Sequence, residues 1–413
     1  MAHQAMQRGR RRMVHLTGLF AGIAGIEQGF HNALGSKVET DLLCESWAPA
    51  QIVLKNRFPG AELHPDVREL ASLPEATDIL SAGFPCQDLS QAGRTAGIRG
   101  EQSGLVTHLF ELLRRRISAG RRLPTLLIEN VPNMLALDKG AAMEFLVQEM
   151  ETLGYSWAYR VVDTRFTGLP QRRRRVIVVA SVNLNPSEVL FADEAASRPD
   201  DHYSSDAFGF YWTEGKGGLG WAPDAIPTLK GGSTIGIASP PAIWVRGAED
   251  ATRALVVPRE AEMESLQGFP RGWTDLDFGL SAARTRGTRS KLLGNAVSVR
   301  VAEWVARRVF APGEVVCPSV DWGSSRQWPN AAAGMGGKRW RVEASEFPTL
   351  EPYEHLLEHV DVSSAPALSR RAVSGFRSRL LQGNLGRYPG FREAVAEADR
   401  ALTEDQLITK LEA

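Results

Sequence analysis

The sequence contains little cysteine. Its three cysteines, Cys44, Cys86 and Cys317, lie far apart and are odd in number. No two of them have the spacing of metal ligands, so the sequence supports neither a disulfide framework nor a zinc site. We therefore expect no bound metal and a location in a reducing cytoplasm.

Net charge and long apolar runs are also absent. Lys plus Arg and Asp plus Glu number 48 each, so the overall basic character of many nucleic-acid-binding proteins is missing. Basic residues still cluster locally, at Arg8–Arg12, Arg114–Arg116 and Arg172–Arg175, and local fields steer a charged partner. No apolar stretch approaches the roughly 18 residues of a membrane span, so we expect no membrane contact. Residues 1–12 indicate a flexible basic N-terminus rather than a signal peptide.

Length and hydrophobic content, 413 residues and 43%, allow two or three domains. Apolar runs alternate with amphipathic stretches, which is typical of an α/β fold with a mostly parallel sheet covered on both faces. We expect strands at Val14–Phe20, Val38–Cys44, Asp78–Ala82, Leu126–Ile128 and Val176–Ala180, and helices at Gly25–Leu34, Leu105–Ile117, Ala141–Leu153 and Ala296–Phe310. Residues 182–225 are rich in glycine, aspartate, serine and aromatics, which indicates a loop-rich recognition insert.

A glycine-containing turn, Phe20-Ala-Gly-Ile-Ala-Gly-Ile26, follows the first expected strand. Gly22 and Gly25 would let the backbone approach a ligand at a helix N-terminus. Glu45 ends the second strand, where nucleotide-binding folds place a carboxylate on ribose hydroxyls. A turn needed only for tight packing explains the glycines equally well. The full dinucleotide fingerprint is missing, which argues against NAD.

Cys86 follows another expected strand end, within Gly83-Phe-Pro-Cys-Gln-Asp-Leu-Ser90. Loops at the carboxyl ends of parallel strands are where sites lie in such folds. Cys86 is therefore a candidate nucleophile, provided that nearby positive charge stabilises its thiolate. A buried structural cysteine is the alternative.

Two further polar patterns adjoin apolar strands. Glu129 and Asn130 end one strand, and the run Arg172–Arg175 enters another. Because side chains alternate along a strand, Arg173 and Arg175 would share a face. Arginines beside a thiol and a phosphate backbone make chemical sense. A satisfied strand-end carboxylate and a solvated charge run are the alternatives.

These blocks, in this order, resemble the cytosine-5 DNA methyltransferase family of bacterial restriction-modification type. The resemblance covers about residues 13–310, and further blocks follow in the family's order: Gln102–Leu105, Arg253–Glu260, Leu266–Pro270 and Gly294–Val297. Any one block could arise by chance, but the ordered set is specific. The resemblance implies the α/β fold of S-adenosylmethionine-dependent methyltransferases, a Rossmann-like mixed sheet with helices on both faces.

The resemblance also implies residue roles, with S-adenosyl-L-methionine as methyl donor and double-stranded DNA as substrate. Cys86 would attack carbon 6 of a flipped-out cytosine, and Glu129 would hold ring nitrogen 3. Arg173 and Arg175 would stabilise the Cys86 loop and the base carbonyl. No protein base for the carbon-5 proton is identifiable. The implied cofactor-binding residues are Phe20, Ala21, Gly22, Gly25, Ile26, Glu45, Asp66, Val67, Pro85, Leu105, Asn295 and Val297, and the implied DNA-binding residues are Gln87, Ser90 and Gln171.

We expect four segments: a flexible N-terminus (1–12), a catalytic and cofactor-binding domain (13–181, completed by 290–312), a target recognition domain (182–289) and a C-terminal extension of unknown role (313–413). Base contacts would come from side chains such as Asp206, Thr213, Glu214 and Lys216. Most aromatics of the recognition region are expected to form a small local core. The basic stretch Ser369–Leu381 is expected to pack on the scaffold rather than to bind DNA.

The sequence departs from the family pattern at Ala24, where glycine is commoner, and at Ser46, where an aromatic often stacks on adenine. Three rival functions are a tRNA cytosine-5 methyltransferase of the same family, a catalytically silent DNA-binding regulator and a nucleotide-dependent oxidoreductase. The separate recognition insert favours DNA over tRNA. We expect a monomer on DNA, with a cognate restriction endonuclease as a partner that the sequence does not identify.

Overall fold

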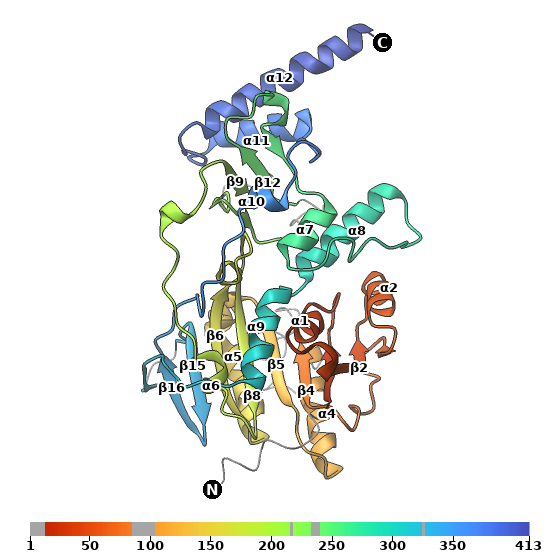
Figure 1. Ribbon diagram of the computed structural model, residues 1–413, viewed down its shortest axis with the longest axis vertical. Coiled ribbons are helices and arrows are strands. Elements are labelled where there is room, and N and C mark those ends of the chain that lie inside the picture. Colours follow the sequence, from red (N-terminus) through yellow and green to blue (C-terminus); the bar gives the residue numbers. More distant parts are fainter. Residues whose placement is uncertain (1–12, 85–103, 215–217, 233–239, 324–326, 413) are drawn as a thin grey trace. The chain divides into compact units, whose positions relative to one another are not determined.

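The computed structural model describes residues 13–84, 104–214, 218–232, 240–323 and 327–412 (Figure 1). The chain forms two compact units, each assembled from separate stretches of sequence. The sheet unit comprises Met1–Asp163, Arg174–Ala196 and Val297–Thr349, and the second unit comprises Thr164–Arg173, Ser197–Ala296 and Leu350–Ala413. The functional domain limits expected from the sequence stay a prediction.

One mixed sheet of ten strands organises the sheet unit. Its parallel half has the order β3-β2-β1-β4-β5, with the bounds β1 Val14–Leu19, β2 Val38–Cys44, β3 Glu62–His64, β4 Ile79–Ala82 and β5 Thr125–Asn130. Its antiparallel half continues from β5 in the order β8-β6-β15-β16-β14, with the bounds β8 Arg174–Ser181, β6 Ser156–Asp163, β15 Ala331–Met335, β16 Lys338–Val342 and β14 Ser319–Asp321.

The α/β fold with a mixed sheet is confirmed, but the sheet is less parallel than the alternation of runs suggested. β6 is buried along almost its whole length, so it lacks the alternation of a half-exposed strand. Arg160 interrupts its apolar run and is fully buried, donating to the carbonyls of Leu190 and Asp193 and to Glu194. The strands β14 to β16 come from residues expected in the C-terminal extension.

Helices cover both faces of this sheet. Their bounds are α1 Gly25–Leu34, α2 Ala48–Arg57, α4 Leu105–Ser118, α5 Ala141–Thr152, α6 Ser187–Leu190 and α9 Val299–Phe310, with short 3-10 helices at Gly35–Lys37, Pro132–Leu135 and Leu137–Gly140. α4 and α5 share one apolar core with alternate residues of the strands, such as Leu80 and Ile128. The next residue along β4, Ser81, points to the other face, where it donates to Glu27 of α1 over 2.6 Å.

The second unit combines a small antiparallel sheet with helices. The sheet has the order β10-β9-β12-β13, and β7 pairs separately with β11. The strand bounds are β7 Gln171–Arg172, β9 Ala207–Phe210, β10 Ala222–Pro223, β11 Ile226–Pro227, β12 Ala242–Val245 and β13 Leu255–Val256. The helices are α7 Glu260–Leu266, α8 Ala282–Asn295, α10 Leu356–His359, α11 Arg370–Gln382 and α12 Phe391–Glu412, with short 3-10 helices at Thr164–Thr167, Asp200–His202 and Ala251–Arg253.

An aromatic core holds the second unit together. Phe210 of β9 stacks on Phe376 of α11 with a centroid distance of 5.2 Å and meets Phe391 of α12 edge-on at 5.0 Å. Trp244 and Leu219 belong to the same buried cluster. The expectation that most aromatics of the region after Ser181 form a local core is therefore confirmed. The Ser369–Leu381 stretch buries its apolar side chains in this core of the second unit, so its packing is confirmed but its place on the scaffold is not.

Among the described residues, no helix combines the length and the apolar character that a membrane crossing requires.

Candidate active site

Polar and glycine-containing segments gather where the parallel strands of the sheet unit end. The turn at Phe20 follows β1, Glu45 follows β2, Asp66 lies just after β3, Gly83 follows β4, and Glu129 lies near the end of β5. Because these strands are parallel neighbours, their carboxyl ends meet at one edge of the sheet. This is the edge at which open α/β sheets bind ligands.

The turn after β1 has an unusual backbone that brings it onto the end of β2. Phe20, Gly22 and Ala24 have φ values of 56°, 56° and 64°, in the left-handed region that non-glycine residues rarely adopt. Such backbone clusters at ligand sites. The amide of Ala21 donates to the carbonyl of Cys44 over 3.1 Å, which ties the turn to β2.

Glu45 is held in place by the backbone of this turn. Its Oε2 accepts from the Gly22 amide over 2.9 Å, and its Oε1 accepts from the Trp47 amide over 2.8 Å. Burial raises the pKa of the Glu45 carboxyl, and the two amide hydrogen bonds partly offset this rise. The turn therefore presents a fixed carboxylate beside glycine backbone, an arrangement that can accept hydrogen bonds from a ribose diol.

The remaining predicted cofactor residues of the sheet unit lie around the same edge. A methyl group added to Gly83 would lie 3.5 Å from Val297 Cγ2 and 4.0 Å from the Phe20 carbonyl oxygen, so these three residues are neighbours. Val67 is buried in the core against which Phe20 and Leu105 pack. Gly25 and Ile26 begin α1 and are buried. Pro85 lies outside the described residues.

Asp66 and Asn295 have surroundings that the sequence did not indicate. Arg68 donates to both carboxylate oxygens of Asp66 and lowers its pKa to about 2, so this side chain is already engaged. Asn295 belongs to the second unit and is packed so closely on Gly231 that a methyl group there would lie 2.0 Å from Asn295 Oδ1. Only glycine fits at position 231 without displacing Asn295.

Glu129 and Arg175 are brought together on neighbouring strands. Arg175 Nε of β8 lies 2.8 Å from Glu129 Oε1 of β5, and the exposed fractions of the two side chains are 13% and 10%. This contact is an ion pair without hydrogen-bond alignment, and within the described residues Glu129 Oε1 accepts no hydrogen bond. The site thus holds a largely buried carboxylate that is paired with a cation.

Asn130 links this carboxylate to the segment that leads to Cys86. Its Nδ2 donates to the carbonyl of Phe84 over 3.0 Å, and its Oδ1 accepts from the Val131 amide over 2.8 Å. The sequence indicates Asn130 only as a polar residue that ends an apolar strand. Cys86, Gln87 and Ser90 lie outside the described residues.

Arg173 lies between β7 and β8, and its sharing of a strand face with Arg175 stays a prediction. β8 begins at Arg174, and Arg173 belongs to the second unit. Arg173 is buried because its guanidinium donates to three backbone carbonyls: Leu229, Gly294 and Ala296. These three bonds join Arg173 to the segments that contain Leu229 and the end of α8.

Gln171 is fully buried in the second unit. Its Nε2 donates to the carbonyl of Leu266 over 2.9 Å and to Gln267 Oε1 over 3.1 Å, and its Oε1 accepts from the Leu229 amide over 3.2 Å. In this structure, Gln171 therefore joins β7 to α7. Its contact with DNA stays a prediction.

The two cysteines that the structure describes are unsuited to nucleophilic chemistry. Burial raises the pKa of the Cys44 thiol to about 12, aided by the nearby charges of Glu45 and Asp66. Burial and a hydrogen bond with Glu194 raise the pKa of Cys317 to about 11. Both thiols are buried and stay protonated at neutral pH. Of the three cysteines in the sequence, this leaves Cys86 as the candidate.

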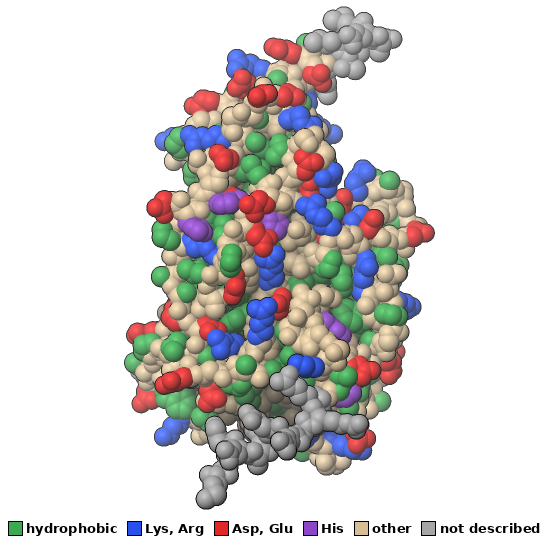
Figure 2. All heavy atoms as spheres, in the orientation of Figure 1, with side chains coloured by type: hydrophobic (Ala, Val, Ile, Leu, Met, Phe, Trp, Pro, Cys, Tyr) green, Lys and Arg blue, Asp and Glu red, His purple; other side chains and the backbone are tan. Residues whose placement is uncertain are grey.

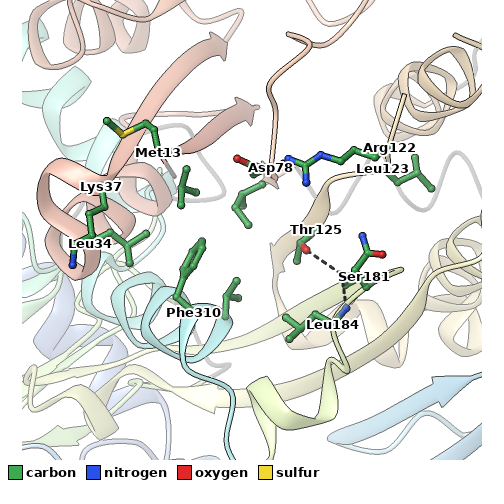
Figure 3. Close-up of a pocket in the computed structure, with 14 residues that line it drawn as sticks. Met13, Leu34, Lys37, Asp78, Arg122, Leu123, Thr125, Ser181, Leu184 and Phe310 are labelled. Carbon is green, nitrogen blue, oxygen red and sulfur yellow. Dashed lines mark hydrogen bonds and ion pairs between the residues drawn. The ribbon is translucent and has the colours of Figure 1, made fainter. Parts of the chain in front are cut away.

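A hollow of about 650 Å³ lies at the opposite edge of the sheet (Figure 3). Its lining includes Val14, Ile79 and Thr125, which begin β1, β4 and β5. The rim carries the ion pair between Arg122 and Asp78. The residues that line this hollow include none of those predicted for catalysis or cofactor binding. The hollow is therefore not the candidate active site.

Comparisons with known proteins point to one family. The model of the C-5 cytosine-specific DNA methylases matches residues 14–209. "Type II methyltransferase M2.BsuMI" of Bacillus subtilis (strain 168) is 43% identical over 369 residues, which cover 87% of this chain and 92% of the relative. "Type II methyltransferase M.MspI" of Moraxella sp is 28% identical over 311 residues, which cover 70% of this chain and 69% of the relative.

Among solved structures, the Dnmt2 methyltransferase of S. pombe is similar, with a TM-score of 0.52 and 15% sequence identity. The match covers 72% of this chain and 98% of that chain. At this identity, the likeness shows a shared fold.

Proposed function

This chain belongs to the family of C-5 cytosine-specific DNA methylases, and on that premise we propose that it methylates carbon 5 of a cytosine in a specific duplex DNA sequence through a covalent adduct with Cys86. The chain is thus a DNA cytosine methyltransferase. The observation that carries the mechanistic proposal is the buried Glu129–Arg175 pair beside the strand end that leads to Cys86.

Cys86 supplies the nucleophile in this proposal. Its thiolate adds to carbon 6 of the base, which breaks the aromaticity of the ring and makes carbon 5 nucleophilic. After carbon 5 has been methylated, loss of its proton and elimination of the Cys86 sulfur restore the aromatic ring. The base must leave the helical stack to reach Cys86, at a cost of a few kcal/mol.

Glu129 and Arg175 act on the charge that this addition creates. A carboxyl group at ring nitrogen 3 favours protonation there as negative charge builds up in the ring. Arg175 holds the Glu129 carboxylate at one side, and its positive charge stabilises the base carbonyl. Arg173 is proposed to act in the same region.

The family implies methylation that depends on S-adenosyl-L-methionine, and the residues after β1 and β2 fit that molecule. The molecule supplies an electrophilic methyl group on its sulfonium. Glu45, clamped by the Gly22 and Trp47 amides, accepts hydrogen bonds from the ribose hydroxyls. Phe20, Ala21, Gly22 and Val297 shape the surface on which the cofactor lies, with Asp66, Val67, Pro85, Leu105 and Asn295 as further contacts.

We extend the proposal to the biological setting. Relatives named Type II methyltransferases support a role as the modification enzyme of a restriction-modification system. In that role, the enzyme works in a bacterial cytoplasm as a monomer on DNA, with a cognate endonuclease that cuts the same sequence. Gln87, Ser90 and Gln171, together with the recognition side chains Asp206, Thr213 and Glu214, are the proposed DNA contacts. Lys216, the fourth candidate, lies outside the described residues.

Transfer of a labelled methyl group tests the proposed substrate. The chain is incubated with S-adenosylmethionine labelled on the methyl group and either unmethylated bacterial genomic DNA or total tRNA. The proposal expects label in DNA, located as 5-methylcytosine within one short sequence. Label in tRNA and none in DNA would contradict it in favour of the tRNA enzyme.

A further inference from the structure

Most of α8 in the second unit has no buried side. Residues 282–291 include no buried residue, and burial begins only at Leu292, near the end of the helix. A surface helix usually buries an apolar stripe, and one that is polar all round needs ion pairs or an external partner for stability. Gly287 further lowers the intrinsic stability of this helix.

The charges on α8 are all of one sign. It carries Arg284, Arg286, Arg289 and Lys291, and it has no aspartate or glutamate. Ion pairs within the helix are therefore excluded. Elsewhere on the surface, basic and acidic side chains are interspersed, as Figure 2 shows for one face, and the whole chain has no net charge.

One of these arginines anchors the helix. Arg289 lies 3.2 Å from the buried Glu264 and 3.2 Å from Asp275, and it donates to Thr274 over 3.0 Å. Glu264 in turn accepts from the amide and hydroxyl of Thr274. This network fixes α8 against α7 and engages the charge of Arg289.

Arg284 and Arg286 are exposed, and within the described ranges no carboxylate forms an ion pair with either of them. We propose that the exposed part of α8 docks on the phosphate backbone of duplex DNA, with Arg284 and Arg286 as phosphate ligands. A helix whose charges are all positive complements a polyanion, and it has no base-reading amide or carboxylate side chains along this stretch. This inference rests on the proposed function, because it takes DNA as the substrate.

The salt dependence of DNA binding tests the docking. Each phosphate contact contributes about −0.9 to the slope of log K against log salt, so removing two contacts should flatten that slope by about 1.8. We expect the double variant Arg284→Gln/Arg286→Gln to show this flattening and a roughly 10- to 100-fold loss of affinity at 0.1 M salt. The measurement is fluorescence anisotropy with a labelled duplex of arbitrary sequence.

A matched control removes the same charge elsewhere. Lys338 and Arg341 are exposed on β16 of the sheet unit, and Lys338→Gln/Arg341→Gln should leave the slope unchanged. Because glutamine is a good helix former and neither α8 arginine forms an ion pair, the α8 variant should unfold at the wild-type temperature. Charge reversal, Arg284→Glu/Arg286→Glu, should deepen the loss.

The outcomes separate the inference from the function it rests on. A wild-type slope in the α8 variant, or an equal flattening in the β16 control, would overturn the docking even where the wild-type enzyme methylates DNA. Failure of the wild-type enzyme to transfer a methyl group to any duplex would instead overturn the proposed function.

Discussion

At the scale of single residues, the surroundings of Glu129 bear most directly on the proposed methyl transfer. Its carboxylate is largely buried and paired with Arg175, yet no described donor forms a hydrogen bond to Oε1. The next residue, Asn130, donates to the carbonyl of Phe84, so the Glu129 carboxylate lies beside the segment that leads to Cys86.

Glu129→Gln should therefore lower kcat by about 10²–10³-fold, because the amide cannot stabilise the charge that develops on the base. DNA affinity should change much less. The control is Glu346→Gln, since Glu346 pairs with Arg174 on the strand that also carries Arg175. Single-turnover methylation measures the effect, and equal rates in the two variants would contradict the role of Glu129.

The raised pKa of Glu45 predicts how cofactor affinity depends on pH. Burial raises the pKa of its carboxyl above the ordinary value. The ionised form accepts hydrogen bonds from ribose hydroxyls, so cofactor affinity should fall as the pH drops through this pKa, and the fall should begin at a higher pH than an ordinary glutamate gives. Asp66 does not titrate in this window, because its pKa is lowered to about 2.

Calorimetric titration of S-adenosylhomocysteine at several pH values checks this expectation. Glu45→Gln should bind more weakly and lose the acid dependence. An unchanged acid dependence in that variant would show that another group controls binding.

At the scale of elements, the turn between β1 and α1 lies at the proposed cofactor site and has a strained backbone. Ala24 adopts φ 64° and is fully buried. A left-handed conformation costs an L-residue roughly 1–2 kcal/mol, and a β-branched residue tolerates it least.

Ala24→Val should destabilise the protein by about 2 kcal/mol or more. Ala24→Gly should change stability by less than about 1 kcal/mol, because relief of strain is offset by a lost buried methyl group and by the greater chain entropy of glycine. Denaturant unfolding of both variants measures these differences. A valine variant as stable as the glycine variant would mean that the backbone at position 24 is not left-handed.

The sequence predicts those strands and helices in which the pattern of apolar residues matches the observed burial. The strands β1, β2, β4 and β5 and the helices α1, α4 and α5 have clear apolar patterns and begin or end within about two residues of the expected positions, whereas the short parallel strand β3 was not expected. It missed β6, which is buried throughout and interrupted by Arg160, and α8, which lacks an apolar period. The motifs placed Glu45 and Glu129 at the correct edge of the sheet. They did not reveal that Arg173 bonds backbone carbonyls, because such contacts depend on segments distant in sequence.

At the scale of the whole molecule, the second unit depends on residues beyond the family match. Phe391 of α12 is fully buried between the rings of Phe210, Trp221 and Trp244. The C-terminal residues are thus part of the core that supports β9 and β12, rather than a separate appendage.

Phe391→Ala should cost about 3–5 kcal/mol of stability in the second unit. The control is Leu381→Ala, at a side chain that is 71% exposed, which should cost almost nothing. Thermal unfolding and limited proteolysis report the difference. A Phe391 variant as stable as the Leu381 variant would contradict the packing of α12 on this core.

The central claim is that this methyltransferase works through a covalent bond between Cys86 and its target cytosine. The most direct measurement is trapping on duplex DNA that carries 5-fluorocytosine, in the presence of S-adenosylmethionine. Fluorine at carbon 5 does not leave as a proton does, so the adduct should persist through denaturation. The claim predicts such an adduct in the wild-type protein and in Cys317→Ser, and none in Cys86→Ser. An adduct that survives in Cys86→Ser would contradict the claim.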